Sequence, residues 1–247
     1  MSDSVLGRTV AWFLDPANYG GPGGIDTRVW EHVWVSLVSV LVATAVALPV
    51  ALWLGHIGRG GAFATALANL GRAVPTLALL VILVIGPFSV GQATLVSVIA
   101  LTVFAIPPIL TNTYAGMRAV DPDLVESARG MGLTGRQVLF RVELPLAVPL
   151  LVAGLRIATA QVVATLAVAA FIAGPGLGRL IRSGLQNQDS AEATGGAVLV
   201  ALLAVLAEVG FQLLGRRLAP ARDSRQVGEA EVDEAAETPE RQQVPVG

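Results

Sequence analysis

Three charged residues interrupt long apolar runs of the sequence: Arg72, Arg156 and Glu208. A charge inside a bilayer costs about 3 kcal/mol on insertion scales, so such a residue usually faces water or a partner of opposite charge. One interpretation is that these side chains line a translocation path or gate. The other is that the two arginines lie near a membrane boundary and that Glu208 pairs with one of them for packing. Arg156 is the hardest to assign to a boundary, because it lies eleven residues beyond Pro145.

The sequence offers no residues for enzyme chemistry. It has no cysteine, which excludes thiolate catalysis, disulfides and thiolate metal sites. His32 and His56 lie at opposite ends of one apolar run and so cannot share a metal ion. The phosphate-cradling G-x-x-x-x-G-K motif is missing, and the arginines form no basic patch for nucleic acid. We therefore expect a protein that is not an enzyme, has no metal or cofactor and does not bind nucleic acid.

The elements that must position the charged residues are membrane-spanning helices. Of the 247 residues, 54% are hydrophobic and only 14% are charged, which excludes an ordinary soluble domain. A helix needs roughly 20 apolar residues to cross a bilayer core. The segments that meet this need are 33–54, 64–85, 93–117, 145–172 and 195–214. The sequence thus predicts an all-α, polytopic membrane protein with about five transmembrane helices.

Arginines in the short connections predict the orientation, because cytoplasmic loops are enriched in basic residues. They follow the first segment, crowd the loop between the third and the fourth, and follow the fifth. With five crossings these regions share one side, which we expect to be the cytoplasm, with the N-terminus outside and the C-terminus inside. The arginines concerned are Arg59, Arg118, Arg129, Arg136, Arg141, Arg216, Arg217, Arg222 and Arg225, against an outside minority of Arg179 and Arg182.

The chain is expected to contain three regions. Residues 1–30 form an extracytoplasmic segment, in which Val5 to Leu14 is expected to be a short interfacial helix that ends at Asp15-Pro16. Residues 31–215 form the transmembrane domain. Residues 216–247 carry many carboxylates among Ala, Gln and Pro, and such a segment cannot bury enough apolar surface to offset its ordering entropy. We expect it to be a disordered acidic cytoplasmic tail.

The residue pattern of the expected cytoplasmic loop 118–144 predicts a helical hairpin. Asp121 and Pro122 fit an N-cap followed by proline at the first helical position. Gly132 is placed to end that helix in a left-handed turn, and Thr134 can cap a second short helix that extends to about residue 141.

An apolar stripe on the first of these helices suggests a use for the hairpin. The stripe consists of Leu124, Val125, Ala128 and Met131. Insertion into a groove on a cytoplasmic partner is one interpretation, because amphipathic helices bind in this way. The alternative is an amphipathic linker that lies at the membrane surface.

The same loop resembles a known motif. The spacing runs from Glu126-Ser127-Ala128 through Gly132 and Val142 to Leu144-Pro145, and it is similar to the EAA loop of permease subunits in binding-protein-dependent ABC importers. Ser127 and Val142 replace the usual Ala and Ile. The resemblance implies a type I importer permease fold in which this loop couples to a separate ATP-hydrolysing subunit. It assigns that coupling role to Glu126, Ser127, Ala128, Gly132, Leu144 and Pro145.

Further blocks resemble the osmoprotectant branch of this family, whose members import glycine betaine, carnitine, choline or proline betaine. These blocks are Glu31-His32 with Ser36, residues 72–79, 111–114, 120–122, 142–147 and 153–156. Residues 173–178 depart from the branch by placing Pro175 in a glycine-rich run. The resemblance implies partners: ATPase subunits, a second permease subunit that is identical or a sister chain, an external binding protein, and membrane lipid.

Alternatives stay open at this point. Another cargo, such as methionine, sulfonate or nitrate, would keep the ABC architecture, whereas a stand-alone channel or secondary carrier would need no ATPase. Pro75, Pro107 and Pro108 either mark broken helices around a midplane path or only bend their helices. Together with Arg72, Arg156 and Glu208, Pro75 and Thr76 are therefore candidate path residues.

Overall fold

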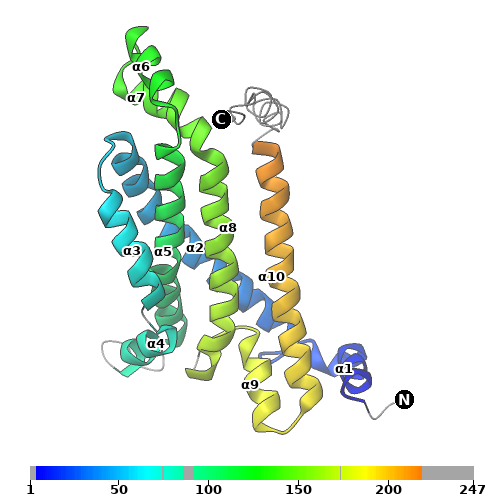
Figure 1. Ribbon diagram of the computed structural model, residues 1–247. Helices are drawn as coiled ribbons and strands as arrows, with labels where there is room; N and C mark the ends of the chain where they lie inside the picture. Colours follow the sequence, from blue (N-terminus) through cyan, green and yellow to red (C-terminus); the bar gives the residue numbers. More distant parts are fainter. Residues whose placement is uncertain (1–3, 74, 86–91, 173, 219–247) are drawn as a thin grey trace, which may run out of the picture.

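The computed structural model describes residues 4–73, 75–85, 92–172 and 174–218, which fold into helices without any strand. Four helices are long and apolar enough to cross a membrane, counting α8 with the turns at its ends: α2 (Ile25–His56), α5 (Ala93–Arg118), α8 (Leu144–Ala169) and α10 (Ser190–Leu218). Figure 1 shows α5, α8 and α10 side by side, with α2 running diagonally behind them. The prediction of an all-α membrane protein is confirmed.

The second predicted crossing, 64–85, consists of two shorter helices, α3 (Gly61–Ala73) and α4 (Thr76–Ile85). Pro75 lies between them, where its ring removes a backbone donor and disfavours helical geometry in the preceding residue. In Figure 1, α3 runs beside α5, whereas α4 turns across the lower end of the bundle. Within the described ranges, four helices rather than five therefore have the full length of a crossing.

Proline does not break the other long helices. Helix α5 continues through Pro107 and Pro108. The hydroxyl of Thr111 donates to the carbonyl of Pro107 at 2.8 Å, and the amide of Asn112 donates to the carbonyl of Pro108 at 2.8 Å. Such side-chain bonds, together with neighbouring helices, let a transmembrane helix tolerate proline.

The connections gather at two ends of the bundle (Figure 1). The α2–α3 connection, helices α6 (Pro122–Gly130) and α7 (Gly135–Val138), and the end of α10 lie at the upper end. Helices α1 (Val5–Leu14), α4 and α9 (Gly178–Gln186) lie at the lower end. The three arginine-rich connections thus share one end of the molecule. Residues 219–247, most of the predicted acidic tail, lie outside the described residues.

Helix α1 has the bounds expected from the sequence and is fastened to α10. The Ser4 hydroxyl accepts the amide of Gly7 and so caps the helix. The Trp12 ring packs on α10 where Gly195 leaves room, since a Cβ there would lie 2.5 Å from the ring. The guanidinium of Arg8 donates to the Ser190 hydroxyl at 2.9 Å. These contacts place the N-terminal segment against the bundle.

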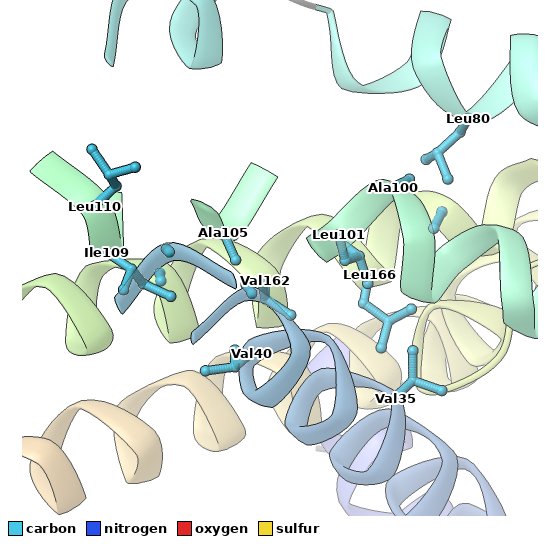
Figure 2. Close-up of a cluster of buried hydrophobic side chains, with 14 of the residues drawn as sticks. Val35, Val40, Leu80, Ala100, Leu101, Ala105, Ile109, Leu110, Val162 and Leu166 are labelled. Atoms are coloured by element: carbon cyan, nitrogen blue, oxygen red, sulfur yellow. The ribbon is translucent and has the colours of Figure 1, made fainter. Parts of the chain in front are cut away.

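The core lies where α2, α5 and α8 pack together, as Figure 2 shows for residues such as Val35, Leu101 and Leu166. Glycines bring α5 and α8 close at two levels. A Cβ on Gly116 would lie 2.9 Å from the carbonyl oxygen of Ala147, and one on Gly154 would lie 2.9 Å from both the Pro108 carbonyl oxygen and the Asn112 Cβ. Small residues at such contacts let membrane helices gain dispersion energy where lipid offers no hydrophobic driving force.

We predict that Gly154→Val destabilises the bundle by about 1–3 kcal/mol, the usual cost of overpacking a close contact. Gly210→Val in α10 is the matched control, because nothing lies within 4 Å of a Cβ at that position. Thermal unfolding in detergent should show a lower Tm for the first variant alone. Equal Tm values would contradict the close α5–α8 contact.

Candidate coupling hairpin and membrane-embedded charges

The coupling hairpin, residues 121–143, begins with the cap that the sequence predicts. The Asp121 carboxylate accepts the amide of Asp123 at 2.9 Å, and Pro122 is the first residue of α6. Thr134 caps α7 reciprocally: its hydroxyl accepts the Gln137 amide, while the Gln137 side chain accepts the Thr134 amide at 2.8 Å. The ends of both short helices are therefore fixed by local hydrogen bonds.

Gly132 makes the turn between the two short helices. Its φ is +86°, a left-handed conformation that other residues rarely adopt. The amide of Leu133 donates to the carbonyl of Ala128 at 3.2 Å, and the amide of Gly132 donates to that of Arg129 at 2.9 Å. This pair of bonds is a Schellman motif, which ends α6 and sets its angle to α7.

The predicted apolar stripe of α6 divides into two parts. Ala128 is buried and Val125 half-buried, and α6 packs on α7 and on the π-helical turn Leu139–Glu143. Leu124 and Met131 point outward instead, with exposed fractions of 50% and 75%. The outer face of the hairpin thus offers large apolar side chains that nothing in the described chain covers.

The residues that the EAA resemblance names lie along this hairpin. Glu126 and Ser127 are exposed on α6, and Glu126 has no ion-pair partner among the described residues. Leu144 and Pro145 open α8, to which the second arm of the hairpin is joined by the π-helical turn. Helix α7 is only four residues long, shorter than the predicted second helix, because the chain changes there to the wider turn.

One hydrogen-bonded pair at the root of the hairpin was not predicted. The buried Glu143 carboxylate lies 2.5 Å from Nδ1 of His56, the last residue of α2. Both side chains line a hollow of about 710 Å³ that also contacts Glu126 and Arg129 of α6. Since 87 positions separate the two residues, no local pattern in the sequence could have joined them. The pair ties α2 to the point where the hairpin enters α8.

At the opposite end, two sequence blocks singled out separately meet in what we call the outer latch: Glu31, His32, Gly176 and Leu177. The Glu31 carboxylate accepts the amide of Gly176 at 2.9 Å, and Nδ1 of His32 accepts the amide of Leu177 at 3.2 Å. Because Nδ1 accepts, Nε2 must carry the proton, and it donates to the Val163 carbonyl at 3.0 Å.

Glycine is required in the outer latch for two reasons. Gly176 has a φ of +93°, and a Cβ there would lie 2.9 Å from the His32 ring. The loop that follows α8 is therefore held against the first long helix. The sequence shows the residue types but not this long-range contact, which spans 145 positions.

Of the three charged residues in the apolar segments, Arg156 and Glu208 form an ion pair. The guanidinium of Arg156 in α8 pairs with the carboxylate of Glu208 in α10 at 3.2 Å, and Gln212 donates to the same carboxylate at 3.1 Å. Pro75 is exposed between α3 and α4. The side chains of Arg72 and Thr76 lie outside the described part of the chain. The pairing of Glu208 with an arginine is therefore observed, while a path role for all five residues stays a prediction.

Comparison with known proteins agrees with this geometry. Residues 43–223 match the family described as binding-protein-dependent transport system inner membrane component. The carnitine transport permease protein OpuCB of Listeria monocytogenes is 36% identical over 204 residues, which cover 82% of this chain and 92% of that protein. The choline transport system permease protein OpuBB of Bacillus subtilis is 34% identical over 199 residues, covering 81% and 90%.

A solved structure shares the fold. The inward-facing MetNI methionine ABC transporter superposes with a TM-score of 0.68 at 26% identity, covering 79% of this chain and 96% of the other. The helical bundle, the interrupted second crossing and the projecting hairpin thus occur in a chain whose sequence matches a permease family over most of its length. The chain belongs to the family of binding-protein-dependent transport system inner membrane components, the multi-pass permease subunits of ABC transporters.

Proposed function

We propose that this permease imports small quaternary ammonium osmoprotectants, such as carnitine, choline or glycine betaine, with energy from separate ATPase subunits. The observation that carries the proposal is the set of relatives at 31–36% identity over about four fifths of the chain, which are named for carnitine, choline and glycine betaine transport. No residue set for ATP binding is present in the sequence, so hydrolysis is assigned to a partner chain.

The coupling hairpin is the proposed binding site for the ATPase subunit. Its exposed Leu124 and Met131 can fill an apolar groove, while Glu126 is free to pair with a basic residue of the partner. Gly132 sets the angle between α6 and α7 and hence the shape that the groove must accept. Ser127 lies on the exposed face of α6, and Ala128 lies on its buried face. Leu144 and Pro145 are the first residues of α8 and so connect the hairpin to that helix.

Movement of the ATPases would reach the membrane through the root of the hairpin. The π-helical turn joins the second arm to α8, and the His56–Glu143 pair joins it to α2. Closure of two ATPase subunits on ATP would draw two hairpins together and tilt the attached helices. A second permease subunit is required for this, because one chain with so few crossings does not enclose a gated path.

The remaining parts of the proposal concern orientation and partners. We place the end that carries the hairpin and the arginine-rich connections in the cytoplasm, by the positive-inside rule. The N-terminal segment and the outer latch then lie outside, where a binding protein delivers solute. Arg72, Pro75, Thr76, Arg156 and Glu208 are proposed to contribute to the path or its gate, since buried charges and a helix break are costly features to keep in a membrane.

Uptake by the reconstituted complex tests the cargo. Proteoliposomes containing the permease, its ATPase and its binding protein should accumulate labelled carnitine, choline or glycine betaine only when ATP is supplied on the ATPase side. Methionine should not compete. Uptake without the ATPase would indicate a secondary carrier, and uptake of methionine alone would replace the cargo while keeping the architecture.

Gly132→Val should weaken ATPase attachment or coupling about 5–30-fold, because a left-handed turn costs a β-branched residue about 1–2 kcal/mol. Gly130→Val is the matched control: both glycines have open space around a Cβ, but only Gly132 has a positive φ. Co-purification of the ATPase and solute-stimulated ATP hydrolysis in liposomes are the measurements. Full activity of the Gly132 variant would contradict the coupling role.

Glu143→Ala should lower the number of solutes imported per ATP hydrolysed, because it leaves His56 without its partner and frees the end of α2 from the hairpin root. Glu143→Gln keeps a hydrogen-bonding side chain and should retain more of the coupling. Parallel assays of uptake and hydrolysis give the ratio. An unchanged ratio in the alanine variant would show that this pair transmits nothing.

A further inference from the structure

The outer surface of the bundle is largely apolar, and one ion pair interrupts it. On α2 the exposed side chains are large and apolar, among them Trp34, Leu41 and Trp53 at 52%, 58% and 62% exposure. Helix α10 also exposes large apolar side chains such as Leu202 and Leu206, but the paired Arg156 and Glu208 side chains are 38% and 37% exposed in the middle of α8 and α10. An ion pair that is more than one third exposed is costly against hydrocarbon, so the surface around this pair is expected to face protein or water.

A groove of about 380 Å³ opens among α3, α5 and α8, and Ala68 contributes the α3 wall. The register of α8 shows which way it faces. Ile157 and Gln161, one helical turn apart, line the groove, whereas the adjacent Ala158 and Val162 are fully buried in the core with α2. The groove therefore lies on the face of α8 directed away from the core, and Ile157 is 45% exposed there.

The lining of the groove is mostly apolar, with three uncharged polar side chains among it. Thr111 and Asn112 contribute a hydroxyl and an amide, each of which has used one hydrogen for a proline carbonyl. Gln161 has no hydrogen-bond partner within the described residues, although it lies in the apolar body of α8. An amide in a membrane helix costs free energy unless water or a solute satisfies it.

The two prolines add acceptors to the groove. Pro107 and Pro108 lack the amide hydrogens that would bond to the carbonyls of Val103 and Phe104 in a regular helix. Phe104 itself lines the groove, mostly buried. Backbone carbonyls without their helical partners attract a positively charged methylated ammonium, which cannot donate a hydrogen bond but can lie against oxygen atoms and a ring edge or face.

We propose that this groove is a solute-contact site on the import path, in which the carbonyl of Phe104 faces a quaternary ammonium group and the Gln161 amide donates to the solute's carboxylate or hydroxyl oxygen. The proposal rests on the function proposed above and adds the place of contact. A second permease subunit covers the open side of the groove. Neutral groups alone hold the solute, so it binds weakly enough to leave, as transport requires.

The absence of cysteine from the chain provides a direct test, because each introduced thiol is the only one. Gln161→Cys and Thr111→Cys place a thiol in the groove, and Leu41→Cys places one on the exposed apolar face of α2. The reagent is 2-(trimethylammonium)ethyl methanethiosulfonate, a permanently charged compound that reacts with thiolate in water. Each variant is first assayed for ATP-driven uptake in the complete complex.

In complexes that transport, the groove thiols should react at least about tenfold faster than the α2 thiol, since a thiol in hydrocarbon does not ionise. Glycine betaine, supplied with its binding protein and ATP, should slow the reaction at residue 161. Groove thiols as inert as the α2 thiol would overturn the proposal, as would rapid labelling that solute leaves unchanged. Either result can occur with ATP-driven uptake intact, so it is distinct from failure of the proposed function.

A second variant is independent of labelling. Gln161→Leu keeps the size of the side chain and removes the amide, so the external solute concentration for half-maximal uptake or the uptake per ATP should change. Val168→Leu, on the exposed surface of α8 outside the groove, is the control. Equal uptake by the two variants at every solute concentration would also overturn the assignment to Gln161.

Discussion

Close contact between α5 and α8 determines most of what the rest of the molecule can do. Gly116 and Gly154 let the two helices approach until a single added carbon would clash with backbone or side-chain atoms. The loop between them is the coupling hairpin, so the hairpin stands on two helices that cannot easily slide apart. The same contact continues into the core with α2 and leaves the groove open on the other side.

Polar contacts join elements at both ends of the bundle, and at the lower end a second apolar cluster around Ile25, Leu177 and Leu180 packs beside them. At one end His56 and Glu143 join α2 to the hairpin root, and at the other the outer latch joins α2 to the loop after α8. Both contacts involve the first long helix, which therefore follows any movement of α8. In the proposed function, this link would carry movement from the hairpin end of the bundle to the end where solute is delivered.

Local features of the sequence were predicted well, and contacts over long separations were not. Helix caps and left-handed turns depend on residues close in the sequence, so the local residue types were enough to predict those at Asp121, Thr134 and Gly132. The outer latch depends on tertiary packing, and its residues belong to blocks that looked unrelated. Prolines show the same limit of prediction from sequence. A helix ends before Pro75, whereas α5 continues through Pro107. The difference depends on whether neighbouring helices satisfy the backbone groups that proline frees.

The π-helical turn at Leu139–Glu143 determines where the outer face of the hairpin points. A turn of this kind holds one residue more than an α-helical turn, and one residue corresponds to about 100° of rotation around the helix axis. The direction in which α7 points around the axis of α8 thus depends on the length of this five-residue segment. Deleting Arg141 from that segment would keep every cap and every apolar side chain of the hairpin, yet it would turn the hairpin toward a different neighbour.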